Sequence, residues 1–192
     1  METLKKMIDE KAAANAFSGV VSIFCREHSI YNNAFGYRDV INEVPNGVET
    51  RFGIASGTKL FTALGIGKLI DQGRLTLETK VGAIDATHAA FIDPDATIRH
   101  LLTHTSGIFD YYDEETLTDF DHCPISIAWS ELETPNDYLP LFVGQTMKFA
   151  AGERYSYSNG GFVFLALLLE KITGQLYREF IKTEILQPAG ML

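Results

Sequence analysis

An almost wholly apolar helix is the feature that most constrains how this chain can fold. The pattern predicts that the helix follows a loop at Phe52 and ends at Gly73, because glycine is a common helix terminator. We expect the rest of the chain to be organised around it. Its apolar positions are Leu60, Phe61, Ala63, Leu64, Ile66, Leu69 and Ile70.

A serine and a lysine stand together where this helix begins. Ser56 is expected in the first turn, and Lys59 is three residues later on the same helix face. Apolar surroundings disfavour the charged form of lysine, and the positive end of the helix favours an alkoxide at serine. Such conditions can turn a weak nucleophile into a usable one. Ser-x-x-Lys alone remains a weak motif, because serine is a common helix cap and lysine a good helix former.

Three segments in a fixed order make the signal specific. The stretch 52–59 resembles the Phe-x-Ile-Ala-Ser-x-Thr-Lys signature of the penicillin-recognising serine hydrolases, which include class C β-lactamases, D-Ala-D-Ala carboxypeptidases and related esterases. Residues 98–107 and Tyr157-Ser158-Asn159 also resemble that family. The resemblance implies an α/β (α+β) fold of the β-lactamase/transpeptidase-like type, with a helical region and an antiparallel sheet flanked by helices.

The resemblance also implies roles for four side chains. Ser56 would attack a carbonyl, and Lys59 with Tyr157 would accept its proton and return it to the leaving group. Which of the two is the base stays open, since Tyr157 could act only if Lys59 stabilised its deprotonated form. Asn159 would orient Lys59 and bind a substrate amide, and it can point to the same side as Tyr157 from an extended segment. The turn at 104–107 is interpreted as scaffold.

Composition limits the partners of the chain. Its 192 residues are 46% apolar and 21% charged, which is typical of one globular domain with a sizeable core. The formal net charge of −9 argues against nucleic acid or an anionic membrane surface as partner. The longest apolar run, 162–169, is too short to span a bilayer. The N-terminus does not resemble a signal peptide, but a removed leader would leave the same sequence, so localisation stays open.

The cysteines and histidines predict no metal site. Two cysteines do not form a disulfide framework, and Cys25 is expected to be a small core residue while Cys123 lies in an acidic loop. His100 and His104 are four residues apart, but the turn after His104 would end their helix. We expect no cofactor.

Local patterns predict the remaining elements. The first part of the chain should form a helix and a hairpin, and the later part should be mainly helical. Asp95 or Thr97 is expected to cap the helix that follows them. The expected elements are a helix at 3–15, strands at 18–25 and 29–36 with a turn at 26–28, a loop at 37–49, a connection at 74–81, and helices at 135–143, 160–173 and 175–186.

Residues 108–135 differ from the rest of the chain, because they hold eight acidic side chains and no lysine or arginine. Aromatic residues are interleaved with the acidic ones. Long segments of this kind are uncommon in compact domains unless they are functional or mobile. Two interpretations stay open: a solvated loop whose aromatics cover the edge of the core, or a flap that selects substrate and disfavours anionic ones. On the second, deletion of 110–121 should change selectivity.

One family element has no counterpart. The family carries a third motif, with Lys or His, Ser or Thr, and Gly, on a late strand that donates an oxyanion N–H, and Lys171-Ile172-Thr173-Gly174 is not a match. We therefore expect 1–192 to be one incomplete domain, with the helix and hairpin in 1–50, the mainly helical region in 51–192, and the C-terminal strands absent. The sheet would then need the C-terminal remainder or self-association, and 1–192 alone should be nearly inactive.

Two functions follow from these observations. The first is a serine hydrolase that forms an acyl-Ser56 intermediate on a small amide or ester: a β-lactam, a D-amino-acid peptide or a small ester. The second is a noncatalytic module that binds ligands through the same cleft, which the absent third motif would favour.

Overall fold

The computed structural model describes residues 2–87, 91–119 and 125–191 of the chain. It forms two compact units, Met1–Ile54 and Ala55–Leu192. His88, His122 and Cys123 lie outside the described residues, as do the last residues of the deletion considered above. Among the described helices, none is both long and apolar enough to cross a membrane.

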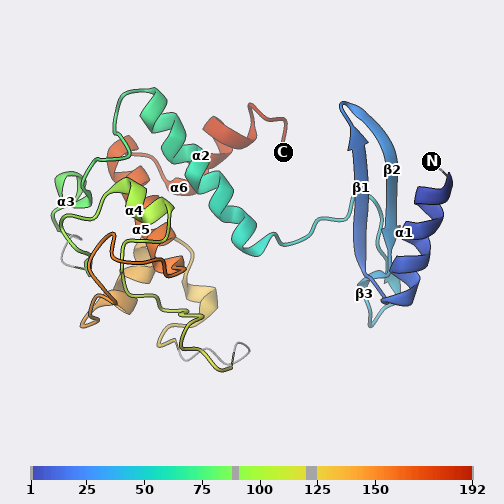
Figure 1. Cartoon of the computed structure of the whole chain (residues 1–192), viewed down its shortest axis with the longest axis horizontal. Helices are drawn as coiled ribbons and strands as arrows, with labels where there is room; N and C mark the ends of the chain where they lie inside the picture. The colour runs from blue at the N-terminus through green and yellow to red at the C-terminus, as the bar shows by residue number, and fades with distance from the viewer. Residues whose placement is uncertain (1, 88–90, 120–124, 192) are drawn as a thin grey trace. The chain divides into compact units, whose positions relative to one another are not determined.

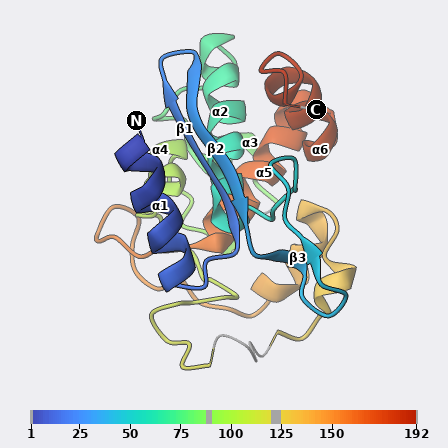
Figure 2. The same cartoon turned by 90° about the vertical axis from the view of Figure 1, so that its right-hand side faces the viewer.

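The first unit is a helix packed on a hairpin. Helix α1 (Glu2–Ala14) is followed by strands β1 (Gly19–Cys25) and β2 (His28–Phe35), which pair antiparallel with Gly19 opposite Phe35. The helix runs along one face of the hairpin (Figures 1 and 2). The buried Tyr31 hydroxyl of β2 donates to Asp9 Oδ1 of α1 at 2.7 Å. The predicted helix and hairpin are confirmed, with the turn shortened to 26–27.

Two expectations for the first unit are wrong. The expected loop at 37–49 contains a small antiparallel ladder of β3 (Tyr37–Asp39) and β4 (Val44–Pro45). Its tight turn forms because Asp39 Oδ1 accepts the Asn42 N–H at 3.0 Å. Cys25 is exposed rather than in the core, because it is the last residue of β1 beside the hairpin turn.

The second unit is built around two apolar helices. Helix α2 (Thr58–Asp71) packs on α5 (Asn159–Thr173), and α4 (Ile98–Leu102) also packs on α5. The core of this unit includes the fully buried Ile66 and Leu69 of α2 and Leu165 of α5. Other elements described in this unit are η1 (Ala55–Gly57), α3 (Val81–Ile84), η3 (Trp129–Glu131), η4 (Pro135–Phe142), α6 (Tyr177–Ile181) and the π-helical turn η5 (Lys182–Leu186).

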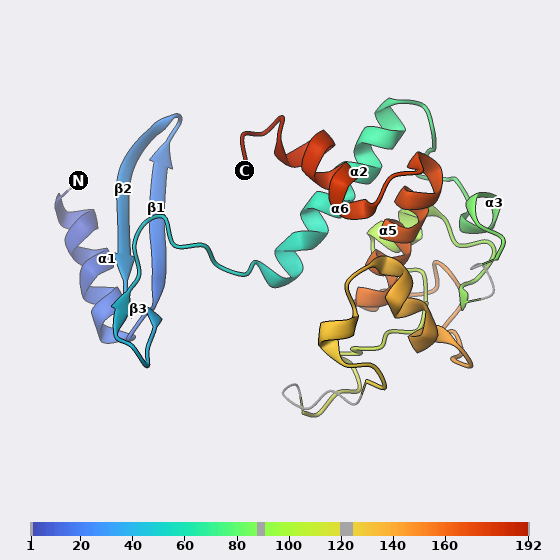
Figure 3. The same cartoon turned by 180° about the vertical axis from the view of Figure 1, so that it is seen from behind.

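Three helices differ from expectation. The single helix expected at 175–186 is α6 followed by η5, which both lie beside α2 (Figure 3). In η5 the turn widens because Gln187 N–H bonds to the carbonyl five residues back, at Lys182, at 2.9 Å. The helix expected at 135–143 is the 3₁₀ helix η4, whose interior Pro140 cannot donate an N–H. The connection after residue 73 ends in the unexpected short helix α3.

The turn at 104–107 positions the segment that leads to Tyr157. Gly107 has a φ of +68°, and a Cβ there would collide with the Phe149 carbonyl. Its own carbonyl accepts the Lys148 N–H at 2.7 Å, and the His104 carbonyl accepts the Ser156 N–H at 2.9 Å. The turn therefore fixes residues 148–156 next to α4, whose N-terminus is capped by Thr97.

Candidate active site

Ser56 lies in a strained turn. It belongs to the 3₁₀ turn η1, immediately before α2. The prediction that Ser56 lies in the first turn of the helix itself is therefore wrong. Ala55 has a φ of 43°, in the left-handed region that residues with a Cβ seldom adopt. Ser56 is exposed, so its hydroxyl is accessible from solvent. Backbone strain of this kind is often concentrated at functional sites.

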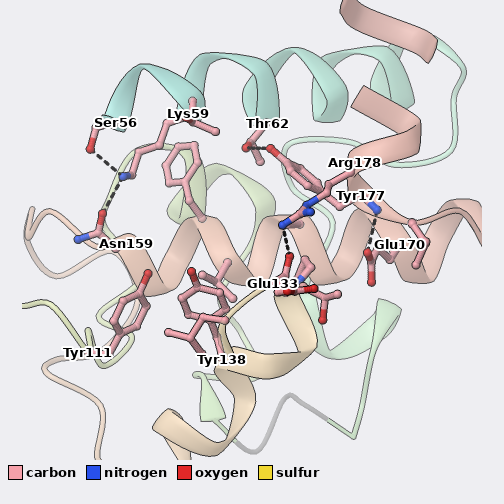
Figure 4. A pocket seen from close by; sticks show the side chains of 18 of the residues that line it. Ser56, Lys59, Thr62, Tyr111, Glu133, Tyr138, Asn159, Glu170, Tyr177 and Arg178 are labelled. Carbon is pink, nitrogen blue, oxygen red and sulfur yellow. Dashed lines mark hydrogen bonds between the residues drawn. The ribbon is translucent and has the colours of Figure 1, made fainter. Parts of the chain in front are cut away.

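The Lys59 ammonium is held between two polar partners. It donates to Ser56 Oγ at 3.2 Å and to Asn159 Oδ1 at 2.7 Å (Figure 4). Two aromatic rings also face it, with Lys59 Nζ 4.8 Å from the Tyr157 centroid and 5.6 Å from the Phe162 centroid. Ring faces attract cations, so the ammonium has little freedom to turn away from Ser56.

Tyr157 approaches the same serine from another direction. Its hydroxyl donates to Ser56 Oγ at 2.7 Å, across 101 positions of sequence. Lys59 and Tyr157 are therefore both within proton-transfer distance of the nucleophile. The structure brings together all four residues singled out in the sequence, Ser56, Lys59, Tyr157 and Asn159.

The His104 ring packs against the ring of Tyr157. Its centroid lies 4.5 Å from that of Tyr157 and 5.1 Å from that of Phe162. His104 Nδ1 accepts the Ser158 N–H at 3.1 Å, which requires an unprotonated Nδ1. Burial and the nearby Lys59 charge lower the pKa of His104, so the neutral ring is favoured. The side chain thus contacts the site, in addition to the scaffold role assigned to its turn.

We expect this histidine to make stability pH-dependent. Since its folded-state pKa lies below the unfolded value of about 6.5, the unfolded chain takes up a proton first as the pH falls. The free energy of unfolding should then decrease as the pH falls below about 6.5. His104→Asn keeps an acceptor and tolerates the residue's φ of 57°. Urea unfolding at several pH values should show a shallower decrease in the variant, and equal decreases would contradict this role.

A buried carboxylate from the acidic segment 108–135 contacts the site. Asp110 is 2% exposed and accepts the N–H groups of Asn159 at 2.7 Å and Gly160 at 3.2 Å. Burial raises the pKa of Asp110, and the N–H donors of Asn159, Tyr112 and Gly160 act in the opposite direction. A sequence signal existed only in part, since an Asp near a predicted turn gives no indication of a partner 49 residues away.

Two neighbouring acidic residues, Asp113 and Glu115, form ion pairs. Lys148 Nζ lies 2.8 Å from Asp113 Oδ2 and 3.0 Å from Glu115 Oε2, and Arg154 lies 3.1 Å from Glu115. Hydrogen bonds from Arg154 and Lys148 lower the pKa of Glu115 to about 2. These pairs attach the described start of the segment to residues 148–156 and compensate part of its charge. A deletion of 110–121 would therefore disturb the site itself, and not selectivity alone as the flap interpretation predicts.

A cavity of about 760 Å³ opens beside Ser56 and Lys59. It runs between α2, α5, η4 and α6, and Figure 4 shows Tyr111 and Tyr138 on the side opposite α2. The ring centroids of Tyr111 and Tyr138 are 5.2 Å apart, and those of Tyr111 and Trp129 are 6.4 Å apart. Aromatic residues of 108–135 thus line the cavity and also pack on the core residue Phe142.

Comparison with known proteins shows which family this chain belongs to. The beta-lactamase family model matches residues 4–192. The chain belongs to the beta-lactamase family. It is 35% identical over 193 residues to penicillin-binding protein 4* of Bacillus subtilis (strain 168). This match covers 100% of this chain and 40% of that protein. Protein flp of Staphylococcus aureus (strain N315) is 28% identical over 199 residues, covering 99% of this chain and 37% of that protein.

Solved structures agree with the fold. A penicillin binding protein from Bacillus halodurans matches with a TM-score of 0.84 and 37% identity, over 93% of this chain and 54% of that one. An octameric penicillin-binding protein homologue from Pyrococcus abyssi matches with a TM-score of 0.78 and 35% identity, over 99% of this chain and 43% of that one. The predicted β-lactamase/transpeptidase-like fold is confirmed. The chain spans about 40% of the length of the curated relatives it matches.

Proposed function

We propose that the chain carries the nucleophilic part of a serine hydrolase that acts on a small amide or ester through an acyl-Ser56 intermediate. The observation that carries the proposal is the convergence on Ser56 Oγ of Lys59 Nζ at 3.2 Å and Tyr157 Oη at 2.7 Å. Covalent catalysis by serine requires a general base within hydrogen-bond reach of the hydroxyl, and this site offers two candidates.

The proton transfers are balanced within this group of residues. One of Lys59 and Tyr157 must first be deprotonated to act as the base. Ser56 Oγ then bonds to the substrate carbonyl carbon as its proton passes to that group. The same proton then moves to the leaving nitrogen or oxygen as that bond breaks, which leaves an ester on Ser56. A water molecule hydrolyses the ester by the reverse transfers. Distances to Ser56 Oγ suit either group as the base.

Asn159 serves chiefly to orient Lys59 in this proposal. Its Oδ1 accepts from Lys59 Nζ at 2.7 Å, while its Nδ2 is directed to Asp110 Oδ2 at 3.4 Å and the Tyr112 carbonyl at 3.3 Å. The amide nitrogen is therefore occupied by the protein in the absence of substrate. The substrate-binding role implied by the family resemblance would require a substrate group to share these contacts.

The relatives of this chain suggest a broad class of substrates. Two of the proteins that this chain matches at 35–37% identity are described as penicillin-binding proteins. We therefore include β-lactams among the expected substrates, beside the D-amino-acid peptides and small esters that the family resemblance implies. The cavity next to Ser56, with its aromatic side chains, fits an acyl group that carries apolar substituents.

Covalent labelling tests the proposal. The chain is incubated with a fluorescent penicillin and, separately, with a fluorescent fluorophosphonate, then denatured and separated on a gel. We expect a fluorescent band with at least one probe after long incubation. Labelling needs one acylation event rather than turnover, so it can accumulate even in a chain whose turnover is nearly absent, and the acyl or phosphonyl bond to Ser56 survives denaturation. Reversible binding in solution without a fluorescent band would favour the noncatalytic alternative instead.

A further inference from the structure

Asp110 connects two parts of the site that the sequence keeps 49 positions apart. Its Oδ2 accepts the backbone N–H of Asn159 at 2.7 Å, and its Oδ1 accepts that of Gly160 at 3.2 Å. Both N–H groups belong to the first turn of α5, where backbone donors have no partner within the helix. The positive end of the helix also favours a carboxylate there.

The same carboxylate faces the side chain of Asn159. Asn159 Nδ2 lies 3.4 Å from Asp110 Oδ2 and 3.3 Å from the Tyr112 carbonyl oxygen. Asp110 Oδ1 in turn accepts the Tyr112 N–H at 3.2 Å, which holds the residue that presents this carbonyl. Two acceptors therefore face one end of the Asn159 amide, and one of them positions the other.

An amide has a donor end and an acceptor end, so this environment allows one orientation. A flipped Asn159 would put its oxygen against a carboxylate and a carbonyl, and its NH₂ group against the Lys59 ammonium. In the observed orientation Oδ1 accepts from Lys59 Nζ at 2.7 Å. We propose that Asp110 is a positioning residue that fixes which end of the Asn159 amide faces Lys59, and through it holds Lys59 at Ser56.

Capping of α5 accounts for the two backbone contacts of Asp110 but not for its contact with the Asn159 side chain. Ser158 is already the N-cap, and its hydroxyl accepts the Gly161 N–H at 3.0 Å. Asp110 accepts from the two preceding N–H groups and, in addition, from a side-chain amide. Both acceptors stabilise the same helix end and both are buried, at 2% exposure for Asp110 and 4% for Ser158. Among these two, Asp110 is the one that contacts the Asn159 side chain.

The difference between Asp110 and Ser158 supplies a matched pair of variants. Asp110→Asn keeps the size of the side chain but replaces one oxygen by an NH₂ group, which meets N–H donors at every contact. Ser158→Ala removes a cap from the same helix end. We expect both variants to melt at lower temperature than the wild type. Only Asp110→Asn should slow fluorophosphonate labelling of Ser56, by roughly 10²-fold, as expected for a displaced catalytic group.

A double-mutant comparison tests whether Asp110 acts through Asn159. In an Asn159→Ala background, adding Asp110→Asn should slow labelling little further, because the amide that it orients is already absent. A full additional loss in that background would contradict the proposal. So would equal labelling rates for Asp110→Asn and Ser158→Ala.

The catalytic meaning of this positioning role rests on the proposed function. A measurement that needs no reaction at Ser56 can test the positioning role separately. Hydrogen exchange of the Asn159 side-chain amide, followed by NMR in the chain of residues 1–192, should be slow in the wild type and in Ser158→Ala. It should be fast in Asp110→Asn. Unchanged protection in Asp110→Asn would overturn the positioning role even if Ser56 is labelled. Loss of protection in Asp110→Asn would support the positioning role even if no probe labels Ser56. Absence of labelling would overturn the proposed function only.

Discussion

Replacing Lys59 by alanine is expected to slow acylation of Ser56 by about 10²–10⁴-fold, the range typical for loss of a general acid or base. The variant removes the ammonium that lies 3.2 Å from Ser56 Oγ and 2.7 Å from Asn159 Oδ1. The rate of fluorophosphonate labelling, followed by intact mass, measures the effect. Circular dichroism verifies that the variant remains folded.

Two other variants make this result specific to the site. Lys68→Ala removes a lysine of the same helix, α2, whose ammonium pairs with Glu184 at 2.8 Å, and it should label at close to the wild-type rate. Lys59→Arg keeps the positive charge but cannot accept a proton at ordinary pH. Slow labelling by Lys59→Arg would favour a base, and fast labelling would favour an electrostatic role. Equal rates for Lys59→Ala and Lys68→Ala would exclude Lys59 from the proton transfer.

Replacing Tyr157 by phenylalanine should also slow acylation by about 10²–10⁴-fold. The ring and its contacts with His104 and Lys59 are retained, and the variant loses only the hydroxyl 2.7 Å from Ser56 Oγ. The effect should therefore appear in the labelling rate and not in the melting temperature.

Tyr155 provides the control for this prediction. It lies two residues earlier, is 62% exposed, and also packs on His104, with ring centroids 6.0 Å apart. Tyr155→Phe should label at the wild-type rate. If Tyr157→Phe labelled as fast as Tyr155→Phe, the Tyr157 hydroxyl would have no part in proton transfer.

Local chemistry explains which parts of this structure the sequence predicts. The pairing of Ser56 with Lys59 follows from residue spacing at a helix start, and the apolar pattern of α2 and α5 predicts both helices. Tyr157 and Asn159 can be placed beside Ser56 only through the family resemblance, because no local pattern relates positions about 100 residues apart.

Details that depend on tertiary contacts could not be predicted. Asp110 is one of eight acidic residues in 108–135, and only the fold shows that it is buried against the N-terminus of α5. Lys148 and Arg154, which neutralise Asp113 and Glu115, lie outside that segment, so its composition alone overstates its free charge. The β3–β4 ladder and the π-helical turn η5 are too short to leave a periodic signal.

One measurement tests the central claim most directly. Trypsin should release residues 52–59, which contain Ser56 as their one serine, because cleavage follows Arg51 and Lys59. After treatment with a fluorophosphonate, mass spectrometry should find the phosphonyl group on Ser56 of this peptide. Ser56→Ala should remain unlabelled while it keeps the wild-type circular dichroism spectrum. An adduct on another residue, or labelling that persists in Ser56→Ala, would contradict the assignment of Ser56 as the nucleophile.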